Sequence, residues 1–154
     1  MNYASDNIKA KVLVPVDEQA QLSRILRAWL QQYPDKPLDR VDFEYLGEES
    51  GLTLSTIQAA FKTRQFIDGS YEAQYQFKLV YRVIATTADE RLKADEVLDN
   101  MGAWAERRED KPQIADNIRV KRIERDTQAS LFDRYENDVE DHQILMKLIY
   151  EVNK

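Results

Sequence analysis

The stretch YEAQYQFKLVYRVIAT, residues 71–86, alternates apolar and polar side chains more regularly than any other part of the chain. Every odd position from Tyr71 to Ala85 carries an apolar or aromatic residue, whereas Glu, Gln, Lys and Arg occupy most even positions. Successive side chains of a β-strand point to opposite faces of the sheet, so a period of two residues predicts a strand with one buried face. The sequence therefore contains at least one long, half-buried strand.

The length of this strand leaves two interpretations open. Its 16 residues, at about 3.3 Å each, span roughly 50 Å. A compact domain of this size is only about 40 Å across. Asp68-Gly69 comes just before the strand, and both residues tolerate the positive φ that tight hairpin turns require. The hairpin either projects from the domain, presenting Phe66, Ile67 and Tyr71 to a partner, or bends and coils within it.

Four further segments have the pattern of strands. Residues 40–46 alternate cleanly, residues 52–66 are mostly β-branched or apolar without proline, and a Gly47–Gly51 turn separates them. In residues 117–127 the alternation slips between Val120 and Ile123, which indicates a bulge. Residues 139–152 carry apolar side chains on both faces, which is typical of a central strand.

Two segments have the apolar spacing of amphipathic helices. Residues 18–33 place Leu22, Leu26 and Trp29 on one face, with Asp17 as the expected N-cap. Residues 88–109 follow a Thr87–Glu90 capping box, and Gly102 within them favours close packing against a sheet. Residues 128–138 are interpreted as a loop whose apolar side chains plug onto the core, namely Leu131, Phe132 and Tyr135.

These elements predict an α+β fold with a mostly antiparallel, mixed sheet of about four to five strands, two packed helices and a long β-hairpin arm. Residues 1–16 are expected to form an N-terminal extended arm or edge strand, since Pro15 cannot donate to a sheet ladder. Residues 17–154 are expected to form a single domain, which suits a chain of 154 residues.

Composition excludes several classes of protein. The chain has no cysteine, which removes disulfides and thiolate chemistry. No run approaches the roughly 20 apolar residues of a membrane helix, and the N-terminus lacks the apolar run of a signal peptide. The net charge of -6 disfavours non-specific DNA binding, because an acidic surface repels phosphates.

The residues that could carry chemistry are few, so we expect no catalysis, no metal and no cofactor. The single histidine, His142, has no nucleophile at a recognisable spacing and is interpreted as a surface or interface residue. The acidic residues between Asp133 and Asp141 lack the glycine of a calcium loop and are interpreted as a solvated loop. The basic residues between Arg119 and Arg125 are interpreted as a polar strand face or an inter-subunit salt-bridge surface.

Several stretches resemble the tail-terminator (tail-completion) proteins of long-tailed phages and prophages of Gram-positive bacteria, often labelled minor capsid proteins. The resemblance covers about residues 22–152 and departs in the N-terminal 16 residues, so the role of the arm is open. It rests on the order and spacing of these pieces: LRAWL at 26–30, DFEYL at 42–46, FIDGS at 66–70, QYQF at 74–77, NMGAWAE at 100–106, ASLFD at 129–133 and LIY at 148–150.

The resemblance implies a virion protein that assembles in the bacterial cytoplasm into a hexameric ring at the head–tail interface. Such a ring stops polymerisation of the tail tube, binds the tail-tube protein and the head connector, and lets DNA pass without specific binding. Another connector component, an adaptor or stopper, is the alternative, and a small-ligand-binding or transferase domain is a second one. The expected interface is the hairpin tip, made of Arg64, Gln65, Phe66, Ile67, Asp68, Gly69, Ser70 and Tyr71.

Overall fold

The computed structural model describes residues 10–154 and has a mixed α+β fold with eight strands in one sheet. The α+β class is confirmed, but the expected four to five strands were too few. The described elements are β1 (Val12–Leu13), α2 (Val16–Leu30), β2 (Asp42–Phe43), β3 (Gly51–Thr56), β4 (Phe61–Gln65), β5 (Tyr71–Ile84), α3 (Ala88–Arg107), β6 (Ile118–Arg125), β7 (Ser130–Arg134), the 3₁₀ turn η1 (Glu136–Asp138) and β8 (Val139–Val152).

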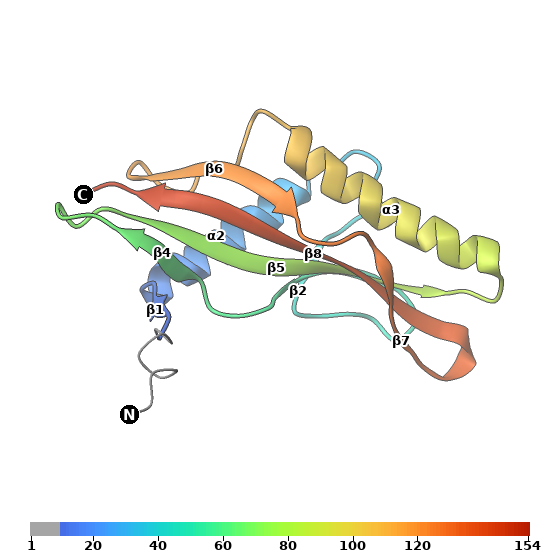
Figure 1. The fold of residues 1–154 in the computed structure, drawn as a ribbon. Coiled ribbons are helices and arrows are strands. Elements are labelled where there is room, and N and C mark those ends of the chain that lie inside the picture. The colour runs from blue at the N-terminus through green and yellow to red at the C-terminus, as the bar shows by residue number, and fades with distance from the viewer. Residues whose placement is uncertain (1–9) are drawn as a thin grey trace, which may run out of the picture.

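Two long antiparallel strands, β5 and β8, form the axis of the sheet (Figure 1). They pair over all 14 of their residues, from Tyr71 opposite Val152 to Ile84 opposite Val139. Strands β4 and β3 line the outer edge of β5, with β1 and β2 beyond them, and β6 and β7 line the outer edge of β8. β8 is therefore central, as its apolar residues on both faces predicted.

The pairing with β8 corrects the expectation of a long hairpin arm. β4 has only five residues, and β8 covers β5 along its whole length, so the long strand lies inside the sheet. The sheet itself is elongated, which is how a strand of this length is accommodated (Figure 1). Of the expected hairpin arm, only the turn formed by residues 66–70, called the tip turn below, extends beyond the paired strands.

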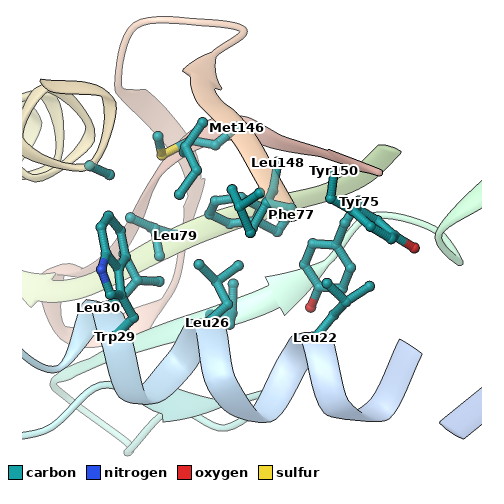
Figure 2. Close-up of a cluster of buried hydrophobic side chains, with 14 of the residues drawn as sticks. Leu22, Leu26, Trp29, Leu30, Tyr75, Phe77, Leu79, Met146, Leu148 and Tyr150 are labelled. Atoms are coloured by element: carbon teal, nitrogen blue, oxygen red, sulfur yellow. The ribbon is translucent and has the colours of Figure 1, made fainter. Parts of the chain in front are cut away.

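Both helices pack on the same face of the sheet and enclose the core. The odd-numbered residues of β5 from Tyr71 to Leu79 are buried there together with the even-numbered residues of β8, such as Phe77 beside Met146. α2 places Leu22, Leu26 and Leu30 against this layer (Figure 2). The apolar face of the helix, whose residues repeat every 3.6 positions, thus packs against the apolar face of the strands, whose residues repeat every two positions.

α3 approaches the sheet closely at Gly102. A Cβ atom there would lie 2.8 Å from Cδ of Arg125 on β6 and 3.0 Å from Cδ1 of Ile144 on β8, so any larger residue would require these side chains to move. The hydroxyl of Thr87 accepts a hydrogen bond from the backbone N–H of Glu90 and caps the helix. The expected cap and the expected close packing are both confirmed.

Other expectations about the elements were wrong. α2 begins at Val16 after Pro15, so Asp17 lies in the first turn and does not cap the helix. Residues 40–46 form a strand only at β2, because Glu44 has a φ of 53° and turns the chain away. Residues 52–66 are mostly strand as expected, divided between β3 and β4, but residues 128–138, expected to be a loop, contain the edge strand β7. Consequently Leu131, Phe132 and Tyr135 are exposed and do not plug the core.

Part of the expected N-terminal arm can be placed. β1 pairs antiparallel with β4, with Val12 opposite Lys62 and Leu13 opposite Phe61. The backbone N–H of Val14 continues this ladder by donating to the carbonyl of Ala60. The interpretation of this segment as an edge strand is therefore confirmed for these residues, whereas residues 1–9 of the expected arm lie outside the described part.

The buried hydroxyl of Tyr75 makes stability sensitive to alkaline pH. It lies 2.7 Å from Oγ of Ser23 on α2, and burial raises the pKa of Tyr75 to about 12. In the unfolded chain the phenol ionises near pH ~10. Its contribution to folding is thus complete below about pH 10 and is lost between about pH 10 and 12, by up to about 1.4 kcal/mol per pH unit.

We expect Tyr75→Phe to cost about 1 kcal/mol at pH 7, from the lost hydrogen bond, and to weaken this alkaline loss. Urea unfolding from pH 7 to pH 11 measures both effects. Some loss should remain in the variant, because burial also raises the pKa of Tyr71 and of Tyr150. Parallel stability curves for wild type and variant above pH 10 would contradict the assignment.

Candidate functional site: the two ends of the sheet

The tip turn is a rigid hairpin loop at one end of the sheet. The N–H of Phe66 donates to the carbonyl of Ser70 at 2.9 Å, and the N–H of Gly69 donates to the carbonyl of Phe66 at 3.1 Å. Oδ1 of Asp68 accepts the N–H of Ser70 at 2.9 Å and also its hydroxyl. Gly69 has a φ of +90°, which favours glycine. The turn predicted at Asp68-Gly69 is confirmed.

The structure separates the expected interface residues into an exposed group and a buried one. Ile67 is fully exposed, Phe66 is about half exposed, and Arg64, Gln65, Asp68 and Gly69 are also at the surface. Tyr71 is buried, and its hydroxyl donates to a carboxylate oxygen of Glu18 on α2. Tyr71 therefore anchors the base of the hairpin to the core, and the exposed apolar surface is limited to Phe66 and Ile67.

The charges at the tip turn are two cations, Arg64 and Lys154, and one exposed carboxylate, Asp68. The guanidinium of Arg64 lies over the Phe66 ring, 5.3 Å from its centroid, and the side chain of Lys154 packs beside Gly69. The predicted basic series on β6 contributes less, because each member is paired with a glutamate of the same chain. The pairs are Arg119 with Glu151, Lys121 with Glu72, Arg122 with Glu124 and Arg125 with Glu106. This supports the interpretation of the series as a polar strand face.

At the opposite end of the sheet, Glu140 is the centre of a buried ionic network. Its carboxylate accepts from Nε of Arg91 at 2.7 Å and from Nε of Arg134 at 3.0 Å. Nε2 of His142 lies 3.2 Å away. Burial alone would raise the pKa of Glu140, but hydrogen bonds from Arg91, His142 and Arg134 outweigh it and hold the pKa below its usual range. The network fixes β7 and α3 onto the start of β8.

The expectation that His142 lies at a surface was wrong. Its side chain is 1% exposed, and its Nδ1 lies 2.7 Å from Oδ1 of Asp95 on α3. With carboxylates at both ring nitrogens and no access to solvent, the imidazole has no room for a substrate. Its role is structural.

The expected acidic loop is also corrected in part. Asp141 is buried, and Nε and Nη2 of Arg82 donate to its two carboxylate oxygens at 2.7 and 2.8 Å. The hydroxyl of Tyr135 donates to the same group at 2.9 Å. Glu140 and Asp141 therefore belong to buried ion pairs, whereas Asp133, Glu136 and Asp138 remain exposed as expected.

Beside this network the surface is hollowed by about 720 Å³. We call this feature the acidic hollow. Its two arginines are already held by buried carboxylates, Arg82 by Asp141 and Arg134 by Glu140. Its three glutamates form no ion pair within residues 10–154, so they make the net charge of its surface negative. The lining residues are Glu48, Glu49, Arg82, Arg134, Tyr135, Glu136, Asn137 and Val139.

Sequence reasoning missed the acidic hollow because its lining comes from separate parts of the chain. The loop after β2, the end of β5 and the turn between β7 and β8 meet only through the sheet. Within residues 10–154, no group of three or more His, Asp or Glu side chains is arranged to hold a metal ion. None of the helices in that range is long and apolar enough to cross a membrane.

The comparisons with known proteins assign no family. No family model matches the chain, and no curated protein is significantly similar to it.

Proposed function

We propose that this chain is a structural subunit of a phage tail, namely a tail terminator that caps the tail tube as a ring. One observation carries the proposal: the two ends of a single long sheet expose different surfaces. One end is the basic, apolar tip turn, and the other is the acidic hollow. Identical subunits close into a ring through two different, complementary surfaces.

The resemblance in sequence supports the same proposal. Its pieces belong to one body and lie in α2, in β2 and the loop after it, in the tip turn, and in β5, α3, β7 and β8. The ring, a hexamer by resemblance, would stop polymerisation of the tail tube and join it to the head connector. The protein would then be located in the virion, at the head–tail interface, with DNA passing through the ring without specific binding.

The test is light scattering and negative-stain microscopy of the purified chain, alone and mixed with the tail-tube protein of the same phage. We expect rings, or caps at the ends of tubes. Binding to the portal-side protein in place of the tube protein would support the adaptor or stopper alternative. A monomer that ignores the tube protein under all conditions would contradict the terminator proposal.

Ile67→Asp is expected to abolish assembly while leaving the monomer folded. Ile67 is fully exposed and makes no core contact, so a charge there removes apolar contact area without disturbing the fold. The matched control is Leu92→Asp, which changes an exposed apolar residue of α3. The thermal midpoint of both variants should equal that of wild type, and only Ile67→Asp should lose rings. Normal rings in Ile67→Asp would exclude the tip turn from the interface.

A second candidate function follows from a groove of about 440 Å³ beside α2. Its lining is mostly apolar and includes Val16, Ala20 and Phe43, with Arg24 and Arg27 at its side. An apolar groove with a few polar groups is the usual form of a small-ligand site. Thermal-shift measurements with acyl-CoA and nucleotides test it, and the absence of any shift would remove this candidate.

A further inference from the structure

We propose that the tip turn of one copy docks into the acidic hollow of a second copy. The inference rests on the proposed function in so far as the ring is the assembly that this contact would build. It goes further by naming both halves of the interface. The partner is another copy of this chain.

The first argument is the position of the two surfaces. The tip turn precedes Tyr71, which is paired with Val152 at one end of the β5–β8 ladder. The acidic hollow includes Val139, which is paired with Ile84 at the other end. Figure 1 shows the two ends at opposite extremes of the long strands. Contact between them is head-to-tail, so each copy uses both surfaces; such contacts build a ring when the rotation from copy to copy closes and a filament when it does not.

The second argument is charge complementarity. Arg64 and Lys154 lie at the tip turn, where their two positive charges outnumber the one exposed carboxylate, Asp68. The acidic hollow presents three glutamates without an intramolecular cation within residues 10–154, namely Glu48, Glu49 and Glu136. Opposite potentials on facing surfaces fix the register and suppress other modes of association.

The third argument is shape and polarity. Ile67 is fully exposed at the apex of a turn that is held by hydrogen bonds. Few groups therefore lose conformational freedom when the turn docks. The acidic hollow offers the part-exposed ring of Tyr135 as apolar surface between its charged residues, and the largely buried Val139 also lies in its lining. An apolar apex with a basic flank therefore matches an apolar floor with an acidic rim.

The chain has no cysteine, so paired cysteines provide a direct test. The test variant carries Ile67→Cys and Glu136→Cys, which lie on the two proposed surfaces. The matched control carries Ile67→Cys and Glu96→Cys, which makes the same charge change on an exposed position of α3. After oxidation, denaturing gel electrophoresis is expected to show a ladder of disulfide-linked multimers in the test variant and only monomer and dimer in the control.

The outcomes test the proposed contact and the proposed ring separately. Equal ladders in both variants, or no ladder while wild type forms rings, would overturn the proposed contact and leave the ring standing. A specific ladder in a protein that forms no rings would support the contact and contradict the terminator. No ladder and no rings would overturn both.

Charge reversal gives a second, independent readout. Arg64→Glu and Glu49→Arg should each weaken association about tenfold at low salt, because like charges then face each other. The double variant restores opposite charges across every head-to-tail contact and should recover most of the loss. The differences should shrink at high salt, where exposed charges are screened. Additive loss in the double variant, measured by analytical ultracentrifugation, would overturn the proposed contact.

Discussion

Glu140→Ala is expected to destabilise the protein by about 3–5 kcal/mol, because it removes the buried carboxylate that Arg91, Arg134 and His142 share. Arg91 and Arg134 both donate to Glu140, and His142 contacts it from the same strand. Removing one member of a buried ionic network leaves the others without compensation for their lost hydration. Urea denaturation followed by far-ultraviolet circular dichroism measures the change.

Glu136→Ala is the matched control, since Glu136 lies four residues earlier on an exposed turn and forms no ion pair within residues 10–154. Its effect should stay within about 0.5 kcal/mol. If the two variants were equally stable, the network around Glu140 would contribute nothing to the fold. The position of β7 would then depend on its backbone pairing with β8 alone.

Phe77→Ala is expected to cost about 3–5 kcal/mol, as is typical when a buried aromatic ring is deleted from a packed core. Phe77 is completely buried at the middle of β5, where it lies beside Met146 in register and 5.9 Å from the ring of Tyr75. Figure 2 shows α2 directly across from it, with Leu26 pointing toward the ring. The cavity would therefore open between the sheet and α2.

Phe132→Ala tests the same chemical change at a surface position, because Phe132 on β7 is 51% exposed. It should cost less than about 1 kcal/mol. A large loss at Phe132 would mean that the ring, which lies under the ammonium of Lys78, contributes to the core after all. A small loss at Phe77 would contradict the packing of α2 on β5.

The sequence predicted those elements whose apolar pattern is long and regular. The alternation in β5 and the two-sided apolar character of β8 identified the axis of the sheet, and the capping box located the start of α3. The short strands were harder. β7 has five residues, and all of them are exposed. It therefore lacks the alternation of apolar and polar residues by which a half-buried strand is recognised. It is a strand because β8 is available to pair with it.

The candidate site was predictable at one end of the sheet only. The tip turn depends on local sequence, since the dipeptide Asp68-Gly69 is enough to predict it. His142 and Glu140 looked like solvated residues because their partners, Asp95 and Arg91, come from α3 about a third of the chain away. Burial of such polar groups depends on tertiary contacts that no local pattern encodes.

The central position of β8 has a consequence for biosynthesis. A ribosome makes β5 long before β8, and within residues 10–154 both β6 and β7 are hydrogen-bonded in the sheet to β8 alone. Until β8 has emerged from the exit tunnel, β5 has one open edge and β6 and β7 have no strand to join. The sheet can therefore be completed only after β8 has emerged, and pairing of such distant segments is intrinsically slow. During that interval the nascent chain exposes an unpaired strand edge, which chaperones or premature pairing with a sister copy would have to cover.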